Sequence, residues 1–307
     1  MKSFRLLFLM MLSLVVPGQA LADANLERCA SNDVSDIDKT IAACTAVISS
    51  GKATGSDLAA AYNHRAGARA SKNDLPGAIA DLSELIKLEP NLPTAFLARG
   101  DVYYSQKNFP NAIKDYAEGV RLKPNWPVAL KYLGDAYDEN GEPAKAIATY
   151  KRALKFDPKY ADVHFDLGIV FRKQGDFKRS MASFDKAIKL VPDHAGAYNG
   201  RCIARAQSGN PRKALADCEK ALDLNSRVSA YWEARAYVRL KLGDLRLAVE
   251  DYSKAIVVDS KNANAWFGRG AVKHKAGDKP GGDTDIATAT KLNPEVAKVM
   301  AKLGVVQ

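Results

Sequence analysis

Residues 127–160 read PVALKYLGDAYDENGEPAKAIATYKRALKFDPKY, and residues 161–194 read ADVHFDLGIVFRKQGDFKRSMASFDKAIKLVPDH. Both stretches place glycine at position 8, glycine followed by an acidic residue at positions 15 and 16, and proline at position 32. The same interval of 34 residues continues on both sides of them. Its position 32 is occupied by Pro90, Pro124, Pro158, Pro192, Ser226, Ser260 and Pro294. The chain therefore contains seven equal units in tandem over residues 59–296.

Each unit predicts two packed helices joined by a tight turn. Positions 8 and 20 hold Gly, Ala, Ser or Cys in all seven units, whereas position 4 always holds a larger side chain. Between the two helices, position 15 is Gly in five units, and position 16 is Asp, Asn or Glu in all of them. A left-handed residue that ends one helix and an N-cap that starts the next would produce this pattern.

This pattern resembles the tetratricopeptide repeat, a helix-turn-helix unit of 34 residues with small residues at positions 8, 20 and 27 and proline at position 32. The resemblance implies an all-α fold, a right-handed superhelical solenoid of antiparallel helix pairs whose first helices line a concave groove. The ends of such an array need caps. We expect residues 23–58 to form an N-terminal helical cap, built as a degenerate repeat, and residues 297–307 to complete a C-terminal capping helix.

Residues 1–22 have the pattern of a secretory signal peptide. Lys2 and Arg5 precede an apolar stretch over residues 6–16, and small residues precede a cleavage site after Ala22. This stretch is too short for a helix that spans a bilayer, which needs roughly 20 apolar residues. We therefore expect an exported protein without a membrane span, located in the periplasm of a Gram-negative bacterium, with secretion as the alternative.

The 4 cysteines predict two disulfides, because the chain is expected to be exported and shows no CxxC spacing. Cys202 and Cys218 occupy positions 8 and 24 of one unit, where a small residue of the first helix normally faces a ring of the second. Cys29 and Cys44 have nearly the same separation within the N-terminal cap. We predict the pairs Cys29–Cys44 and Cys202–Cys218. Buried free thiols and a redox-active pair are the alternatives.

Arginine at position 7 and aspartate at position 23 occur together in five units. The other two units have leucine at position 7 and a hydroxyl residue at position 23. This joint occurrence predicts a bidentate Arg–Asp bridge inside each of the five units, while a cationic stripe for a polyanion is the alternative. The predicted pairs are Arg65–Asp81, Arg99–Asp115, Arg201–Asp217, Arg235–Asp251 and Arg269–Asp285.

No motif in the sequence points to catalysis. The 4 histidines share no helix at the spacing of metal ligands, and His164 replaces the large residue of position 4, which favours a role in the core. The sequence contains no P-loop, GxGxxG, HExxH or GxSxG motif. We predict that the protein is not an enzyme and uses no cofactor and no metal.

The resemblance places the partner-binding groove on positions 2, 5, 9, 12 and 13 of the first helices. Phe165 and Ile169 would offer an apolar anchor between acidic and basic side chains, which suits an extended or a helical partner segment. For each residue, a merely solvated surface position is the alternative. The predicted partner-binding residues are Lys131, Asp135, Asp138, Glu139, Phe165, Ile169, Arg172, Lys173 and Tyr237.

These features favour a non-catalytic scaffold that binds another envelope protein, or a peptide segment of one, in the groove. The net charge of +10 motivates an alternative, in which charge drives binding to an anionic envelope polymer or a membrane surface. Export argues against nucleic acid as the partner. Self-association stays open.

Overall fold

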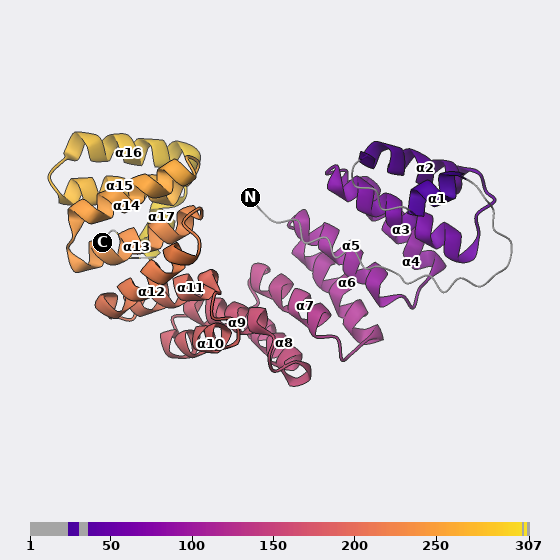
Figure 1. The fold of residues 1–307 in the computed structure, drawn as a ribbon, viewed down its shortest axis with the longest axis horizontal. Coiled ribbons are helices and arrows are strands. Elements are labelled where there is room, and N and C mark those ends of the chain that lie inside the picture. Colours follow the sequence, from indigo (N-terminus) through magenta and orange to yellow (C-terminus); the bar gives the residue numbers. More distant parts are fainter. Residues whose placement is uncertain (1–23, 31–35, 303, 306–307) are drawn as a thin grey trace. The chain divides into compact units, whose positions relative to one another are not determined.

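The computed structural model describes residues 24–30, 36–302 and 304–305, and every regular element among these residues is a helix (Figure 1). The fold is an all-α helical repeat solenoid, as the 34-residue period predicts. The expected signal peptide, residues 1–22, lies outside the described residues. Within the described ranges, no helix has the length and apolar character needed to cross a membrane.

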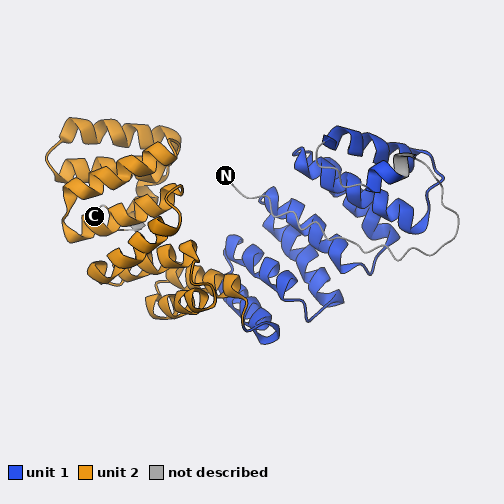
Figure 2. Cartoon of the chain, viewed as in Figure 1, with its two compact units in different colours: residues 1–158 blue, residues 159–307 orange. Residues whose placement is uncertain are grey.

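The chain forms two compact units, residues 1–158 and residues 159–307 (Figure 2). Unit 1 contains α1 (Ala24–Ala30), α2 (Ile37–Ser49), α3 (Gly55–Ser71), α4 (Leu75–Leu88), α5 (Pro93–Ser105), α6 (Phe109–Leu122), α7 (Pro127–Glu139) and α8 (Pro143–Phe156). Unit 2 contains α9 (Ala161–Lys173), α10 (Phe177–Leu190), α11 (Ala195–Gln207), α12 (Pro211–Leu224), α13 (Ser229–Leu242), α14 (Leu245–Val258), α15 (Ala263–Lys275), α16 (Lys279–Leu292) and α17 (Val296–Lys302). Within each unit, a helix packs chiefly against its neighbours along the chain.

We number the repeats 1 to 7 from Ala59 onwards, and each contains one first and one second helix. The turn between them is made by a left-handed residue and a cap. In repeat 4, Gly175 has a φ of +76°, and the Asp176 carboxylate then accepts a hydrogen bond of 2.9 Å from the N–H of Arg179, which starts α10. Lys107 takes the same conformation in repeat 2, with a φ of +59°. Turn geometry therefore outweighs residue preference at that position.

Glycine at position 8 lets the second helix lie directly against the first. A Cβ added to Gly134 would lie 2.5 Å from the Tyr150 ring, and one added to Gly168 would lie 2.6 Å from the Phe184 ring. Both distances are too short for carbon atoms in contact, so alanine at either position would push the two helices apart.

Both predicted disulfides are present. Cys202 and Cys218 take the place of the glycine and the ring in repeat 5, and their disulfide joins α11 to α12 with a Cα–Cα distance of 5.4 Å. Cys29 and Cys44 join α1 to α2 at the start of unit 1, with a Cα–Cα distance of 4.8 Å. The described residues contain no free cysteine.

The last helix covers the end of repeat 7. Val296 and Met300 of α17 are buried in a cluster with Phe267 and Ala289, while Val299 on the same helix is 38% exposed. The side of α17 that faces α15 therefore continues the core of unit 2.

Candidate partner-binding site

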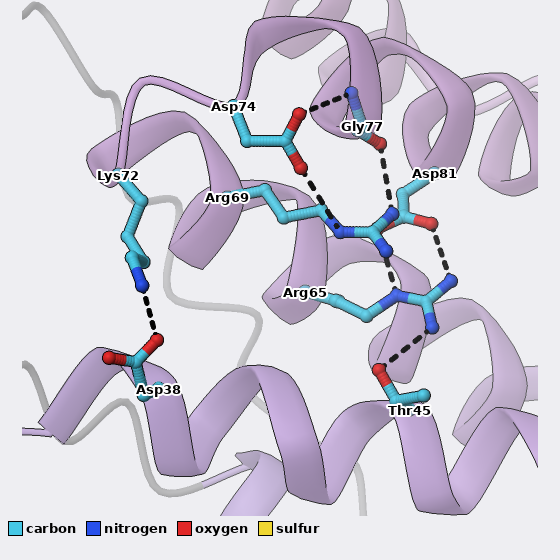
Figure 3. A network of polar contacts seen from close by, with 8 residues as sticks. All are labelled: Asp38, Thr45, Arg65, Arg69, Lys72, Asp74, Gly77 and Asp81. Carbon is cyan, nitrogen blue, oxygen red and sulfur yellow. Dashed lines mark hydrogen bonds and ion pairs between the residues drawn. The ribbon is translucent and has the colours of Figure 1, made fainter.

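The arginines of position 7 are engaged inside the fold. In repeat 1, Nε and Nη2 of Arg65 lie 3.0 and 2.7 Å from the two carboxylate oxygens of Asp81 (Figure 3). Nη1 of Arg65 donates to the Thr45 hydroxyl at 3.1 Å, and Arg69 donates to the same Asp81 at 2.9 Å. Arg65 and Asp81 are both buried. This arginine therefore connects α2, α3 and α4 and does not present its charge to a ligand.

The same geometry occurs at the other four predicted pairs, where Nε and Nη2 lie 2.6–3.0 Å from the two carboxylate oxygens. These pairs are Arg99–Asp115, Arg201–Asp217, Arg235–Asp251 and Arg269–Asp285. The hydrogen bond to Asp115 raises the pKa of Arg99. Burial raises the pKa of Asp285, but the hydrogen bonds from Arg269 and Lys273 outweigh it, so this pKa lies below its usual value.

These arginines make two further contacts that were not predicted from the sequence. First, a second cation at position 11 joins the same aspartate, as Arg205 does with Asp217 at 2.6 Å. Second, Nη1 of the position 7 arginine reaches position 25 of the preceding repeat. These contacts are Arg99–Ser83 at 3.0 Å, Arg201–Asp185 at 2.6 Å and Arg269–Ser253 at 3.1 Å. Basic residues recur at position 11 in four repeats, and that signal could have revealed the first contact.

The four predicted residues on α7 belong to unit 1, and two of them form an internal ion pair. Lys131 is buried, and its ammonium lies 2.9 Å from the Asp135 carboxylate. The Tyr150 hydroxyl donates a hydrogen bond of 2.8 Å to the same carboxylate. Asp138 is half-buried and Glu139 is exposed. The charges of Lys131 and Asp135 therefore neutralise each other within the fold.

The other predicted residues lie on the first helices of unit 2. These helices, α9, α11, α13 and α15, pack against one another in that order. We call the surface formed by their positions 5, 9, 12 and 13 the A face. Its members on α9, α11 and α13 include Phe165, Ile169, Arg172, Lys173, Asn199, Ile203, Gln207, Glu233, Tyr237 and Lys241.

An apolar shelf occupies the α9 part of the A face. The Phe165 ring lies 5.8 Å from the ring of Phe184 and 4.9 Å from the ring of His194, measured between centroids. Ile169 lies one helical turn further along α9 and packs against the same buried cluster. Phe165 and Ile169 are both half-buried, so part of each side chain is accessible to an apolar group of a partner.

Three polar side chains on the α9 and α11 part of the A face bury an atom that has no hydrogen-bond partner among the described residues. These atoms are Nε of Arg172, Oδ1 of Asn199 and Oε1 of Gln207. Burial lowers the pKa of Arg172, yet a guanidinium stays charged in a protein. Each such atom costs about 1–3 kcal/mol if it stays unpaired. A carboxylate and the backbone N–H groups of a bound segment would supply the missing partners.

Asn199 and Gln207 were not predicted as site residues. They occupy positions 5 and 13 of repeat 5, and both positions belong to the groove set that the resemblance implies. Lys173, which was predicted, is exposed beside Arg172. The structure thus brings Phe165, Ile169 and Arg172 together on one helix and adds two amides from the next.

The α13 part of the A face has different surroundings. Tyr237 is only 7% exposed, so this predicted contact residue is covered. Burial raises the pKa of Glu233 and outweighs the hydrogen bonds that its carboxylate accepts from Asn262 and Asn264, the first of them 3.0 Å long. The hydroxyl of the fully buried Tyr252 has no hydrogen-bond partner in the part of the chain that the structure describes.

The chemistry of the A face suits the recognition of a peptide segment. Among the described residues it offers an apolar shelf, a guanidinium whose Nε has no hydrogen-bond partner, and two amides with unpaired acceptors. His164 is buried, as its place in the repeat predicts. Within the described ranges, no group of three His, Cys, Asp or Glu side chains is arranged to hold a metal ion.

Comparison with protein-family models finds three that match this chain. A model described as TPR repeat matches residues 67–107, 134–175 and 235–277, and two described as tetratricopeptide repeat match residues 161–194 and 93–125. Together these matches cover more than half of the chain. None of the curated proteins compared with the chain matches it.

Several solved structures share the fold. The crystal structure of MamA protein is 25% identical with a TM-score of 0.50, and the match covers 55% of this chain and 92% of that one. A tetratricopeptide repeat protein from Parabacteroides merdae is 16% identical with a TM-score of 0.67, over 87% of this chain and 100% of that one. YrrB, described as a TPR protein with an unusual peptide-binding site, is 21% identical with a TM-score of 0.50, over 62% of this chain and 97% of that one.

Proposed function

The chain belongs to the tetratricopeptide repeat family, and from this premise we propose that it is a non-catalytic scaffold of the periplasm. It binds an extended segment of another envelope protein on the A face of unit 2. The repeats and their structural neighbours support the general function of a protein-interaction scaffold. The signal-peptide pattern of residues 1–22 and two disulfides, which persist in oxidising compartments, support the location.

One observation carries the assignment of the site: the Arg172 guanidinium is partly buried and Nε has no partner, beside the apolar shelf of Phe165 and Ile169. A buried cation is stabilised by an anion within hydrogen-bonding distance, and planar carboxylates fit a guanidinium best. The partner segment therefore carries an acidic residue close to an apolar side chain. Its backbone N–H groups pair with Asn199 and Gln207.

The test starts with capture of the partner from an envelope extract and mapping of the bound segment. The affinity of a labelled peptide of that segment is then measured for Arg172→Met and for Lys173→Met. Both variants remove one positive charge from the same helix end, but only Arg172 has the buried unpaired nitrogen. We expect Arg172→Met to weaken binding by about 10- to 100-fold, as for loss of a charge-assisted hydrogen bond, and Lys173→Met by much less. Equal effects of the two variants would reject the assigned site.

A second candidate function is binding of an anionic envelope polymer or membrane surface, and α8 in unit 1 favours it. This helix contains no acidic residue, and its Lys151, Arg152 and Lys155 are exposed. Phe156 beside them is 51% exposed. Binding of this kind weakens steeply as salt rises, whereas an anchored peptide is retained at about 1 M salt, where the Debye length is roughly 3 Å. A variant with Lys151→Gln, Arg152→Gln and Lys155→Gln that abolishes capture would favour this second function.

A further inference from the structure

The last helix, α17, stands where the first helix of an eighth repeat would begin. The 34-residue count continues with residue 297 at position 1 and Gly304 at position 8. α17 packs against α15, as α11, α13 and α15 each pack against the first helix before them in unit 2 (Figure 1). In repeats 3 and 4, the glycine of position 8 stays helical under a ring of the second helix. Among the described residues, a Cβ added to Gly304 would instead meet Lys241 and Tyr237, both on α13.

Gly304 ends α17 and redirects the chain. Its φ is +71°, its N–H donates to the carbonyl of Ala301 at 2.9 Å, and the N–H of Val305 donates to the carbonyl of Met300 at 3.1 Å. This pair of hydrogen bonds is the Schellman arrangement, which commonly brings the residue after the glycine into apolar contact with the helix end. Val305 is thereby placed against the cluster that contains Met300.

Val305 also contacts the core beyond α17. It packs against the cluster of α13, α14 and α15 that includes Leu240 and Tyr252, and against the cluster of α11, α12 and α13 that includes Tyr237. The Cβ position of Gly304 lies 3.3 Å from the Lys241 ammonium and 4.0 Å from the Tyr237 hydroxyl. Gly304 and Val305, which we call the strap, therefore lie over the α13 part of the A face.

The strap divides the A face of unit 2. On α9 and α11, the shelf and the unpaired atoms of Arg172, Asn199 and Gln207 remain without an occupant from the described chain. On α13, an aliphatic side chain from a residue more than sixty positions away fills the surface beside Tyr237. Among the described contacts, one valine side chain and no side-chain hydrogen bond attach the strap to the α13 surface. Another segment with a similar aliphatic residue can therefore replace it.

We propose that the A face of α13 and α15 is a binding surface for a short aliphatic segment, and that the strap occupies it in cis. A partner segment bound on α9 and α11 then extends onto α13 only after the strap leaves. The statement about the partner segment rests on the proposed function, whereas the occupancy of the α13 surface by the strap does not. The strap therefore lowers the affinity for long partner segments and leaves the affinity for segments confined to α9 and α11 unchanged.

Accessibility of the Tyr237 ring tests the occupancy in the full chain. Tyrosine nitration, followed by mass spectrometry, is compared between the unmodified chain, Val305→Asp and Val299→Asp. Val299 is exposed on the same helix, so its variant controls for the added charge. We expect Val305→Asp to raise the nitration rate of Tyr237 about tenfold and Val299→Asp to leave it unchanged. An unchanged rate in Val305→Asp, with helix content and thermal midpoint preserved, would overturn the proposal.

A second measurement does not depend on the folding of Val305→Asp. A labelled peptide AKLGVVQ, the sequence of residues 301–307, is titrated into the full chain and into a chain that lacks residues 303–307. We expect the shortened chain to bind the peptide at least about tenfold more tightly, and to bind AKLGDVQ more weakly than AKLGVVQ. Equal binding to both chains, or no binding to the shortened one, would reject the strap. Either result leaves the test of Arg172 and the proposed function unaffected.

Discussion

Arg201 and Arg172 lie on neighbouring helices of unit 2 and have opposite surroundings. Arg201 donates to both carboxylate oxygens of Asp217 and to Asp185, at distances of 2.6–3.0 Å. Burial lowers the pKa of Arg201, but these hydrogen bonds outweigh it and the pKa is raised. No carboxylate of the described residues pairs with Arg172, and burial lowers its pKa. Arg201 is thus held inside the fold by carboxylates, whereas Nε of Arg172 has no partner among the described residues.

The same contrast occurs between two buried tyrosines at position 24. The Tyr116 hydroxyl donates to Asp101, at position 9 of its own repeat, over 2.6 Å. The Tyr252 hydroxyl has no partner, and position 9 of its repeat is Tyr237. The carboxylate that accepts from the tyrosine hydroxyl in repeat 2 thus has no counterpart at position 9 of repeat 6.

The largest effect is expected where a paired aspartate is removed. Asp251→Ala leaves Arg235 and Arg239 without their shared carboxylate in a buried site. We expect the free energy of unfolding to fall by about 3–5 kcal/mol in urea titrations. Ser183→Ala is the matched control at position 23 of repeat 4, because its hydroxyl only donates to the Arg179 carbonyl, and we expect it to cost less than about 1 kcal/mol. Similar losses in the two variants would show that the bridges contribute little.

A smaller difference in the free energy of unfolding is expected between substitutions of the two tyrosines. Tyr116→Phe removes a hydrogen bond to a charged acceptor, and we expect a loss of about 1.5 kcal/mol in the free energy of unfolding. Tyr252→Phe removes an unpaired hydroxyl of a buried ring, and we expect no loss or a slight gain. Thermal or urea unfolding of both variants measures the difference. A clear loss in Tyr252→Phe would mean that a water or a ligand satisfies this hydroxyl.

The smallest effect concerns a carboxylate that has amides as partners. The pKa of Glu233 is raised by burial, so the folded state disfavours the ionised form. Below the ordinary pKa of 4.5, the group is protonated in both states and folding carries no penalty from it, whereas the penalty grows as pH rises through the raised pKa. We expect Glu233→Gln to raise the thermal midpoint near pH 7 and to change it little near pH 4. A gain that is the same at both pH values would contradict the raised pKa.

The sequence predicted the fold because its period determines both helix ends and helix contacts. Gly175 and Asp176 form the turn that their column predicts, and Gly134 lies under the Tyr150 ring as small and large residues at positions 8 and 24 require. The intra-repeat bridges were also predictable, since the arginine and the aspartate are absent together from two repeats. The turns, helix contacts and ion pairs inside one repeat recur every 34 residues, so they can be predicted from the repeat positions.

The candidate site was only partly predictable, because it depends on contacts between helices that the 34-residue spacing does not define. The sequence predicted Lys131 as a groove residue, yet Asp135 one turn later neutralises it in a buried position. Tyr237 is covered by Gly304 and Val305, which lie beyond the seven repeats. The unpaired atoms of Asn199 and Gln207 follow from burial, and burial depends on how neighbouring repeats pack.

The contact between an arginine at position 7 and position 25 of the preceding repeat also bears on how the array opens. In a linear array, stability is a sum of terms for each repeat and for each junction between neighbours. The contacts Arg99–Ser83, Arg201–Asp185 and Arg269–Ser253 strengthen three such junctions. The junction between repeats 2 and 3 in unit 1 has Leu133 in the arginine position and cannot form this contact. Amide hydrogens near that junction should therefore exchange with solvent through local opening sooner than those beside the arginine contacts.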